Sequence, residues 1–357
     1  MKNLLKLILI CAVCVVSIFA FNGNLFERNE TTTQPVLDYN AEFGWKSMHY
    51  YNQLDDAGKD AYITMYATVK NFDEKCTLKI DDETLSEVFT AVLYDNPEIF
   101  WIKTDYKYFD YGNKVTFKPN YSYSREETIQ YTTQLNNKVN EILSQASLCV
   151  TDYEKELYFH DYICENTTYD MDTFGSVGAS VHNTLINGRA VCEGYARAMQ
   201  ILLDKSGIYN YLIIGDGTAD GETEPHMWNV VQLNNENYHL DVTWNDLDDD
   251  LGTSYFYFNV NDNFISSDHI NIKPSDNNCY SSDANYFVVD GSEIGSFNGF
   301  NSHIERSVKK LNSGSNSISF YFKNREDYDK AVNDLNDNDV FFDYVNKTVK
   351  KCKRKIY

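Results

Sequence analysis

Hydrophobic residues recur with two different periods along the chain. Four segments have apolar side chains that return every three or four residues, which is typical of amphipathic helices: 50–72, 81–101, 124–146 and 151–170. Pro97 breaks the second of these helices. Residues 106–123, YKYFDYGNKVTFKPNYSY, instead alternate around a Gly-Asn pair, which predicts a β-hairpin. The first part of the chain is therefore predicted to be mainly helical, with one hairpin.

The stretch 187–207, NGRAVCEGYARAMQILLDKSG, joins a polar turn to a further helical pattern. Its apolar residues fall at helical spacing, and Ser206-Gly207 is a typical helix C-terminus. This helix would begin at Cys192. Three predicted strands follow it along the chain: 209–217, 226–233 and 237–244.

The order of these elements predicts an α+β protein. A single strand at 317–322 and a single helix at 325–337 are predicted near the C-terminus. The sequence divides into five predicted segments: a leader (1–21), a polar linker (22–40), a helical and hairpin region (41–150), a core of helices followed by strands (151–274) and a small α/β tail (275–357).

The leader has the features of a targeting segment. Lys2 and Lys6 precede an apolar run from Leu7 to Phe21, which is shorter than the roughly 20 residues that a membrane-spanning helix needs. This pattern predicts a secretory signal peptide, with a cleavage site after Ala20. An uncleaved membrane anchor is the alternative. Both place the body of the protein outside the cytoplasm, either secreted or at the cell surface.

The chain is acidic, with a net charge of −22. Such a chain repels nucleic acid phosphates and anionic lipids, so neither is an expected partner, and the only expected membrane contact is the N-terminal anchor. The chain has eight cysteines, two of them in the leader. The other six are widely spread with no CxxC pair among them, which argues against a zinc site. If Cys192 is a nucleophilic thiol, the other five cysteines outside the leader cannot all form disulfides within the chain.

Cys192 is the first candidate for chemistry. A helix N-terminus stabilises an anion through its unpaired amides and its dipole, so we expect the pKa of this thiol to fall. The same amides could hold the oxyanion of a tetrahedral intermediate. Gly188 and Gly194 would leave room for a substrate backbone. The simpler alternative is a buried structural cysteine.

A nucleophilic cysteine needs a base and an acceptor that orients the base. His226 opens a predicted strand after the Gly- and Asp-rich loop GDGTADGETEP, where a substrate could enter. Asp241 lies inside the next predicted strand, YHLDVTW, where a carboxylate is costly unless it has a partner. The turn NNEN could place Asp241 opposite His226. Cys192 would then attack, His226 would move the proton and Asp241 would fix the ring.

These three motifs, GRAVCEGYARAMQILLDKSGI, HMWNVV and YHLDVTWND, resemble the transglutaminase-like cysteine superfamily. The resemblance extends over about residues 50–270 and includes FHDYICENTTYD and YDNPEIFW, as in secreted bacterial members. It implies a papain-like core in which a helix with the cysteine packs on an antiparallel sheet with the histidine and aspartate. It also implies Cys192 as nucleophile, His226 as base and Asp241 as orienting carboxylate.

The resemblance further implies a framework around the site, made of Glu193, Gly194, Tyr195, Trp228, Asn229 and Trp244. In one place the chain departs from the pattern. Many relatives have a tyrosine-glycine pair before the cysteine turn, whereas this chain has His182-Asn183. The second oxyanion donor is therefore unassigned.

Other histidines and acidic residues carry weaker signals. His239 shares a strand face with Asp241 and is the alternative base, although the loop before His226 favours His226. His160 is expected to be a packing or surface residue. The acidic segment NDLDDDLG fails the calcium-loop pattern, because Leu251 replaces the invariant glycine and Tyr257 the bidentate glutamate.

Together these features predict acyl transfer through a Cys192 thioester. The acyl donor would be a glutamine side chain or a peptide bond in a protein or peptide at the cell surface. The acceptor would be a lysine amine, giving cross-links, or water, giving hydrolysis. The chemistry requires no cofactor and no metal. The alternative from another class is a catalytically inert extracellular interaction module on the same fold.

Overall fold

The computed structural model describes residues 19–20, 42–173, 179–219, 221–247, 252–300, 302–304, 306, 309 and 320–337. Apart from Phe19–Ala20, the predicted leader and linker lie outside these residues, as do residues 248–251 of the acidic segment NDLDDDLG. Among the described helices, none has the length and apolar character needed to cross a membrane.

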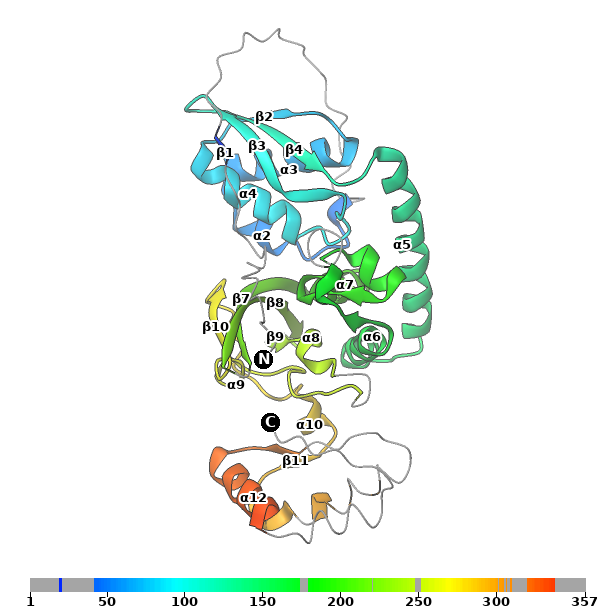
Figure 1. Ribbon diagram of the computed structural model, residues 1–357, viewed down its shortest axis with the longest axis vertical. Coiled ribbons are helices and arrows are strands. Elements are labelled where there is room, and N and C mark those ends of the chain that lie inside the picture. Colours follow the sequence, from blue (N-terminus) through cyan, green and yellow to red (C-terminus); the bar gives the residue numbers. More distant parts are fainter. Residues whose placement is uncertain are drawn as a thin grey trace, which may run out of the picture.

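The N-terminal part is a four-stranded sheet with helices packed beside it, drawn at the top of Figure 1. The predicted hairpin is present as β3 and β4, which pair antiparallel. The strand order is β1-β3-β4-β2, and only β1 runs parallel to its neighbour. The elements are β1 (Phe19–Ala20), α2 (His49–Gln53), α3 (Asp56–Asn71), β2 (Cys76–Leu78), α4 (Asp82–Tyr94), β3 (Ile102–Asp110) and β4 (Val115–Tyr121).

Two capped helices connect this part to the next. Helix α5 (Arg125–Ala146) runs along one side of the molecule, and α6 (Asp152–Asn166) follows it (Figure 1). Each helix starts with a capping box, in which a Ser or Thr side chain and a Glu three residues later satisfy backbone amides reciprocally. The sequence therefore sets both helix starts locally.

The central part combines helix α7 (Cys192–Lys205) with a fully antiparallel sheet of order β10-β7-β8-β9. The strands are β7 (Asn210–Ala219), β8 (Glu222–Leu233), β9 (Glu236–Leu240) and β10 (His269–Lys273). Before α7 come β5 (Thr168–Tyr169), which pairs with β6 (Arg189–Ala190), and the short helices η1 (Met171–Thr173) and η2 (Asn183–Asn187). Two further short helices, α8 (Val242–Asn245) and α9 (Asp262–Ile265), lie between β9 and β10.

Several strand boundaries differ from those predicted, and two of these differences concern the candidate site. Strand β8 starts at Glu222, not at His226, and its ladder with β7 continues to the pair Ala219 and Glu222. The predicted substrate-access loop is thus mostly a hairpin, closed by a tight turn at Gly221 with φ of 80°. Polar residues can occupy both faces of these strand ends because the ends are exposed, so the apolar alternation that marks a strand is missing there.

Asp241 does not lie inside a strand. Strand β9 ends at Leu240, and Asp241 is the N-cap of α8, where its Oδ1 accepts a hydrogen bond from the Trp244 amide at 3.1 Å. Aspartate is favoured at this position because its side chain satisfies an amide of the first helical turn. The turn between β8 and β9 is the predicted one, with positive φ at Asn234 and Asn235.

One hydrophobic core cluster runs through both the N-terminal and the central part, from Phe43 to Ala284. Polar contacts reinforce this junction. Arg197 on α7 donates to the Leu93 carbonyl oxygen at 2.8 Å, and Gln200 donates to that of Tyr94 at 2.6 Å. Helix α7 is therefore held from the side of the N-terminal helices as well as from its own sheet.

The described residues of the C-terminal part form a small separate cluster around Ile294, Phe300 and Ala331. Strand β12 overlaps the predicted strand, and α12 covers the residues for which the sequence predicts a helix. The elements are α10 (Tyr286–Val289), β11 (Glu293–Ile294), η3 (Phe297–Gly299), β12 (Tyr321–Phe322) and α12 (Arg325–Asp337), with β11 and β12 parallel.

Candidate active site

Cys192 is the first residue of α7, as the sequence predicts, and its side chain is buried. The turn before it is held rigidly. Gly188 has φ of 65°, and a Cβ there would lie 2.7 Å from the Asn166 carbonyl oxygen. This glycine therefore allows a close approach between two parts of the backbone, and the space beside it is filled by the protein itself. The side-chain Nδ2 of Asn183 donates to the Arg189 carbonyl oxygen and so braces the same turn.

The residues after Cys192 anchor the first turns of α7. The amides of Gly194 and Tyr195 both bond to the Val191 carbonyl oxygen, so neither is available as an oxyanion donor. Glu193 accepts a hydrogen bond from Arg197 at 2.8 Å, and the Tyr195 hydroxyl donates to Asp246. The side chains of Glu193 and Tyr195 thus both have hydrogen-bond partners within the fold.

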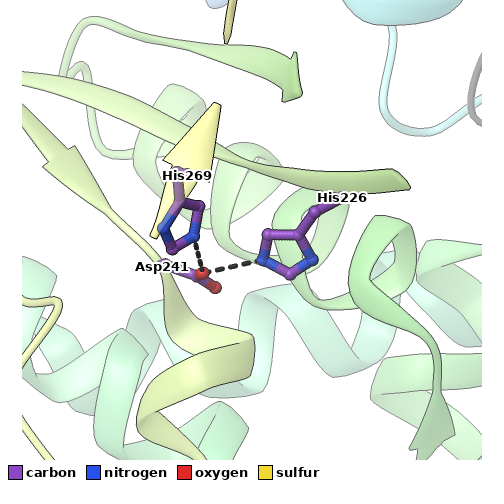
Figure 2. Close-up of side chains that lie close together, drawn as sticks. All are labelled: His226, Asp241 and His269. Atoms are coloured by element: carbon purple, nitrogen blue, oxygen red, sulfur yellow. Dashed lines mark hydrogen bonds and ion pairs between the residues drawn. The ribbon is translucent and has the colours of Figure 1, made fainter. Parts of the chain in front are cut away.

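His226 and Asp241 lie together, with Nε2 of His226 2.7 Å from Oδ2 of Asp241 (Figure 2). An ionised carboxylate can only accept, so this ring nitrogen carries the proton. The other ring nitrogen, Nδ1, points away from Asp241 (Figure 2). Asp241 is fully buried, and its backbone amide bonds to the Tyr257 carbonyl oxygen at 3.0 Å. The carboxylate can thus fix both the tautomer and the orientation of the His226 ring.

A second histidine, His269, bonds to the same carboxylate oxygen as His226 (Figure 2). Its Nε2 is 3.1 Å from Oδ2 of Asp241, and its Nδ1 is 2.7 Å from Oδ1 of Asp268. No role for His269 is predicted from the sequence, because its neighbours form only a short strand. The one signal was the adjacent Asp-His pair. Its place at the site depends on β10 pairing with β7, where His269 lies opposite Gly217.

The charges of this cluster favour an ionised Asp241. Burial alone would raise the pKa of the Asp241 carboxyl, but the charges and hydrogen bonds of His226 and His269 lower it below its usual range. Burial would likewise lower the pKa of His269, but the hydrogen bonds and charges of Asp241 and Asp268 raise it to about 9. At neutral pH, His269 is therefore an imidazolium between two carboxylates.

Two tryptophans enclose the histidines. The Trp228 ring stacks on His226 at 5.7 Å between centroids, and the Trp244 ring lies 5.6 Å from His226 and 4.3 Å from His269. Trp228 is fully buried, and its Nε1 donates to Nδ1 of His239 at 3.1 Å. These indoles remove water from one side of the imidazoles, which strengthens the hydrogen bonds to Asp241.

Hydrogen bonds tie the helix that bears Cys192 to the elements that bear the histidine and the aspartate. Nδ2 of Asn229, three residues after His226, donates to the Ala196 carbonyl oxygen at 3.0 Å. The Tyr195–Asp246 bond joins the same helix to the end of α8. Both contacts lie within about one helical turn of Cys192. Through these contacts, Asn229 and Tyr195 connect α7 to β8 and to the end of α8.

Other histidines have structural partners. Both ring nitrogens of His239 are used, by Trp228 and by Asp262 at 2.9 Å, which disfavours His239 as the alternative base. His160 is buried against Tyr255 and Phe258, as a packing residue. His182, in the pair that departs from the family pattern, packs on Phe100 and Tyr131 and bonds to Gln134.

Within the part of the chain that the structure describes, two clusters have residue types that can bind a metal, His226/Asp241/His269 and His239/Asp262/Cys279. In the first, the distances of 2.7 and 3.1 Å from Oδ2 to the two nitrogens suit hydrogen bonds. Ligand atoms around tetrahedral zinc, with bonds of about 2.0–2.2 Å, would be roughly 3.3 Å or more apart. In the second, Nδ1 of His239 accepts a hydrogen bond from Nε1 of Trp228. The ring's own proton is therefore on Nε2, the atom that faces Asp262.

Residues 140–248 match the model of the transglutaminase-like superfamily. This segment includes Cys192, His226 and Asp241, whereas His269 lies beyond it. Members of the superfamily are generally cysteine enzymes, including transglutaminases and cysteine proteases. No curated protein matches the chain.

Similar solved structures include a TGase at 14% identity and a TM-score of 0.29, covering 47% of this chain and 50% of that one. A candidate cysteine protease from Cytophaga hutchinsonii has 13% identity and a TM-score of 0.26, covering 36% and 52%. A candidate protease from Parabacteroides distasonis has 13% identity and a TM-score of 0.23, covering 39% and 35%. The chain thus spans about half or less of each, and TM-scores this low carry no argument about function.

Proposed function

We propose that the protein is a cysteine-dependent acyltransferase or amide hydrolase in which Cys192, His226 and Asp241 act together. The observation that carries the proposal is the buried His226–Asp241 hydrogen bond, made by residues whose strand and short helix are bonded to α7 near Cys192. A carboxylate, an imidazole with its second nitrogen directed away from that carboxylate, and a cysteine at a helix N-terminus are the parts of a thiol acyl-transfer site.

The chemistry follows from these parts. Nδ1 of His226 takes the proton from the Cys192 thiol as the sulfur attacks the carbonyl carbon of an amide. The tetrahedral intermediate collapses, the C–N bond breaks, and the His226 imidazolium gives its proton to the departing amine or ammonia. The acyl group stays on sulfur as a thioester. His226 then takes a proton from the acceptor, an amine or water, as its nitrogen or oxygen attacks the thioester carbonyl carbon. The C–S bond breaks, the acyl group passes to the acceptor, and the His226 imidazolium returns a proton to the sulfur, which restores the thiol.

The surroundings support this chemistry in two ways. Asp241 stabilises the imidazolium that forms on His226, since the carboxylate is ionised and buried beside it. Trp228 and Trp244 exclude water from the imidazole, which favours an amine acceptor over hydrolysis only if the acyl group is equally shielded. We propose a protein or peptide amide as donor and a location outside the cytoplasm, both on the basis of the sequence.

The first experiment measures how fast iodoacetamide labels Cys192 as a function of pH. An activated thiol reacts well below pH 8.5, and Cys149, which is partly exposed, provides an internal reference in the same sample. Labelling of Cys192 that rises only near pH 8.5 would support the inert interaction module instead.

The second experiment identifies the reaction. The full chain is incubated with a glutamine peptide and a primary amine, and the products are analysed by mass spectrometry beside Cys192→Ala and the control Cys149→Ala. Amine incorporation by the wild type and by Cys149→Ala, but not by Cys192→Ala, establishes transamidation. Deamidation or cleavage without incorporation establishes hydrolysis. No product in any sample, with ordinary thiol reactivity, refutes the proposal.

A further inference from the structure

His269 is buried beside the proposed catalytic pair, but the proposed chemistry does not use it. Its side chain is 1% exposed, and both ring nitrogens face carboxylate oxygens, Oδ2 of Asp241 and Oδ1 of Asp268. Carboxylates accept hydrogen bonds, so a ring that satisfies both must donate from both nitrogens, which only the imidazolium can do. The geometry therefore places a positive charge directly against the carboxylate that orients His226.

The far end of this arrangement is also fixed. The Tyr257 hydroxyl donates to Oδ2 of Asp268 at 2.7 Å, and the Tyr257 carbonyl oxygen accepts from the Asp241 amide. The Tyr257 amide in turn bonds to Oδ1 of Asn245, in the helix that Asp241 caps. Asp268, Tyr257 and Asp241 thus form a closed set of hydrogen bonds around the His269 ring, and none of these groups can rotate without breaking one of them.

Charged and titratable groups face His269 from every element packed against it. Asp241 and Asp268 bond to it, and the His226 and Tyr257 rings lie 5.4 and 5.5 Å away between centroids. Burial lowers the pKa of His239, and the charge of His269 also acts to lower it. With His226 neutral, two carboxylates and one imidazolium leave the group with a net charge of −1. A single negative charge therefore remains to stabilise a proton arriving on His226.

We propose that His269 is a positioning residue for the acyl-transfer site. It holds Oδ2 of Asp241 in place, through Asp268 and Tyr257, so that Asp241 keeps His226 in the one tautomer and orientation that presents Nδ1 to Cys192. This inference rests on the proposed function for its kinetic consequences. The orientation of His226 can also be measured without any turnover.

The test compares three variants of the full chain with the wild type. His269→Ala removes both donors, whereas His269→Gln keeps one N–H that can reach Asp241. Asp268→Asn leaves His269 in place but weakens its hold, and it disturbs packing least because Asp268 is partly exposed. The matched control is Asp216→Asn, which removes one carboxylate charge from neighbouring strand β7, where Asp216 accepts a hydrogen bond from Asn271 and pairs with Ile270.

Kinetics give the first readout. With a glutamine peptide and a primary amine, we expect His269→Ala to lower kcat about 10- to 100-fold with little change in KM, since misplaced catalytic groups cost about this much. His269→Gln should recover part of the loss. Asp268→Asn removes a carboxylate that raises the pKa of His269, so the alkaline limb of the kcat profile should shift to lower pH. Asp216→Asn should match the wild type. Unchanged kcat and pH profile in folded His269→Ala would overturn the inference.

Imidazole nitrogen NMR separates this inference from the proposed function. In the wild type, His226 should show a single Nε2–H tautomer, and His269 should show two protonated nitrogens at pH 7. In His269→Ala or Asp268→Asn, the His226 signals should shift toward a mixture of tautomers. If wild-type Cys192 proves unreactive but these signals behave as described, only the proposed function fails. If His226 keeps its tautomer in both variants, the positioning role is refuted whatever the activity.

Discussion

The indole ring of Trp244 occupies the space where Gly217 would carry a side chain. A Cβ built at Gly217 lies 2.7 Å from Cζ2 of this ring, well inside van der Waals contact. Gly217 also pairs with His269 across the sheet, and Trp244 packs on both His226 and His269. The absence of a side chain at Gly217 on β7 thus sets how closely the Trp244 ring approaches the two imidazoles.

Gly217→Ala is therefore expected to displace Trp244 and to impair the site. The backbone at Gly217 does not have a positive φ, so the cost comes from overpacking, about 1–3 kcal/mol of unfolding free energy. Urea denaturation and the rate of Cys192 alkylation measure the two effects. Gly295→Ala is the matched control, because a Cβ there meets nothing within 4 Å. Equal behaviour of the two variants would mean that Trp244 does not depend on Gly217.

His226 and His239 should respond differently to alanine substitution. His226→Ala removes the proposed base, so acyl transfer per folded molecule should fall about 10²- to 10⁴-fold, and it also takes one partner from the buried Asp241 carboxylate, which should cost about 1–3 kcal/mol of unfolding free energy. His239→Ala leaves Trp228 and Asp262 without their partner, which should cost about 1–3 kcal/mol of unfolding free energy. The rate per folded molecule of His239→Ala should remain within a few-fold of the wild type. A larger rate loss in His239→Ala than in His226→Ala would reverse the assignment of the base.

The raised pKa of His269 makes folding stability depend on pH. The imidazolium is favoured in the folded state, whose pKa is about 9, against 6.5 in the unfolded chain. Its contribution is therefore fully present below about pH 6.5 and is lost as the pH rises through about 9, at most on the order of 3 kcal/mol. Unfolding free energies of wild type and His269→Gln should differ most near pH 6 and converge near pH 9.5. A difference that is constant with pH would show that His269 is neutral in the fold.

Local signals in the sequence predict the start of α7 at Cys192 and its end at Ser206-Gly207, because helix termini are specified by nearby residues. The β8–β9 turn at Asn234-Asn235 is local too, and it brings His226 and Asp241 within one hairpin. Each of the transglutaminase-like motifs is likewise one short continuous stretch of sequence. These parts of the candidate site could be predicted without coordinates.

The errors have a different origin. The hairpin end at Glu222 carries no apolar alternation, so its strand character comes only from pairing with β7. Asp241 is an N-cap, and a cap next to a strand end looks like a strand residue in the sequence. His269 joins the site through β10, which is paired with a strand about fifty residues earlier in the chain. Contacts that distant leave almost no trace in a single sequence.

Asp204, in the last turn of α7, gives a test of the junction between the N-terminal and central parts. Its Oδ1 accepts from the Ser47 hydroxyl at 2.6 Å and from Asn210 at 3.0 Å. Burial raises its pKa to about 8, although the Ser47 bonds oppose the shift. The folded state therefore holds a proton that the unfolded chain releases above about pH 4. Between about pH 4 and about pH 8, the contribution of Asp204 to the unfolding free energy falls by about 1.4 kcal/mol per pH unit.

Asp204→Asn removes this titration while keeping an oxygen for Ser47 and Asn210. The unfolding free energy of the variant minus that of the wild type should rise between pH 5 and pH 8. The new amide group can change this difference by a constant amount, but that amount does not depend on pH. Urea unfolding at the two pH values measures the change, with Asp283→Asn as the exposed control that shows none. A relative stability of Asp204→Asn that stays flat across this range would mean that Asp204 is ionised in the fold, in spite of its burial.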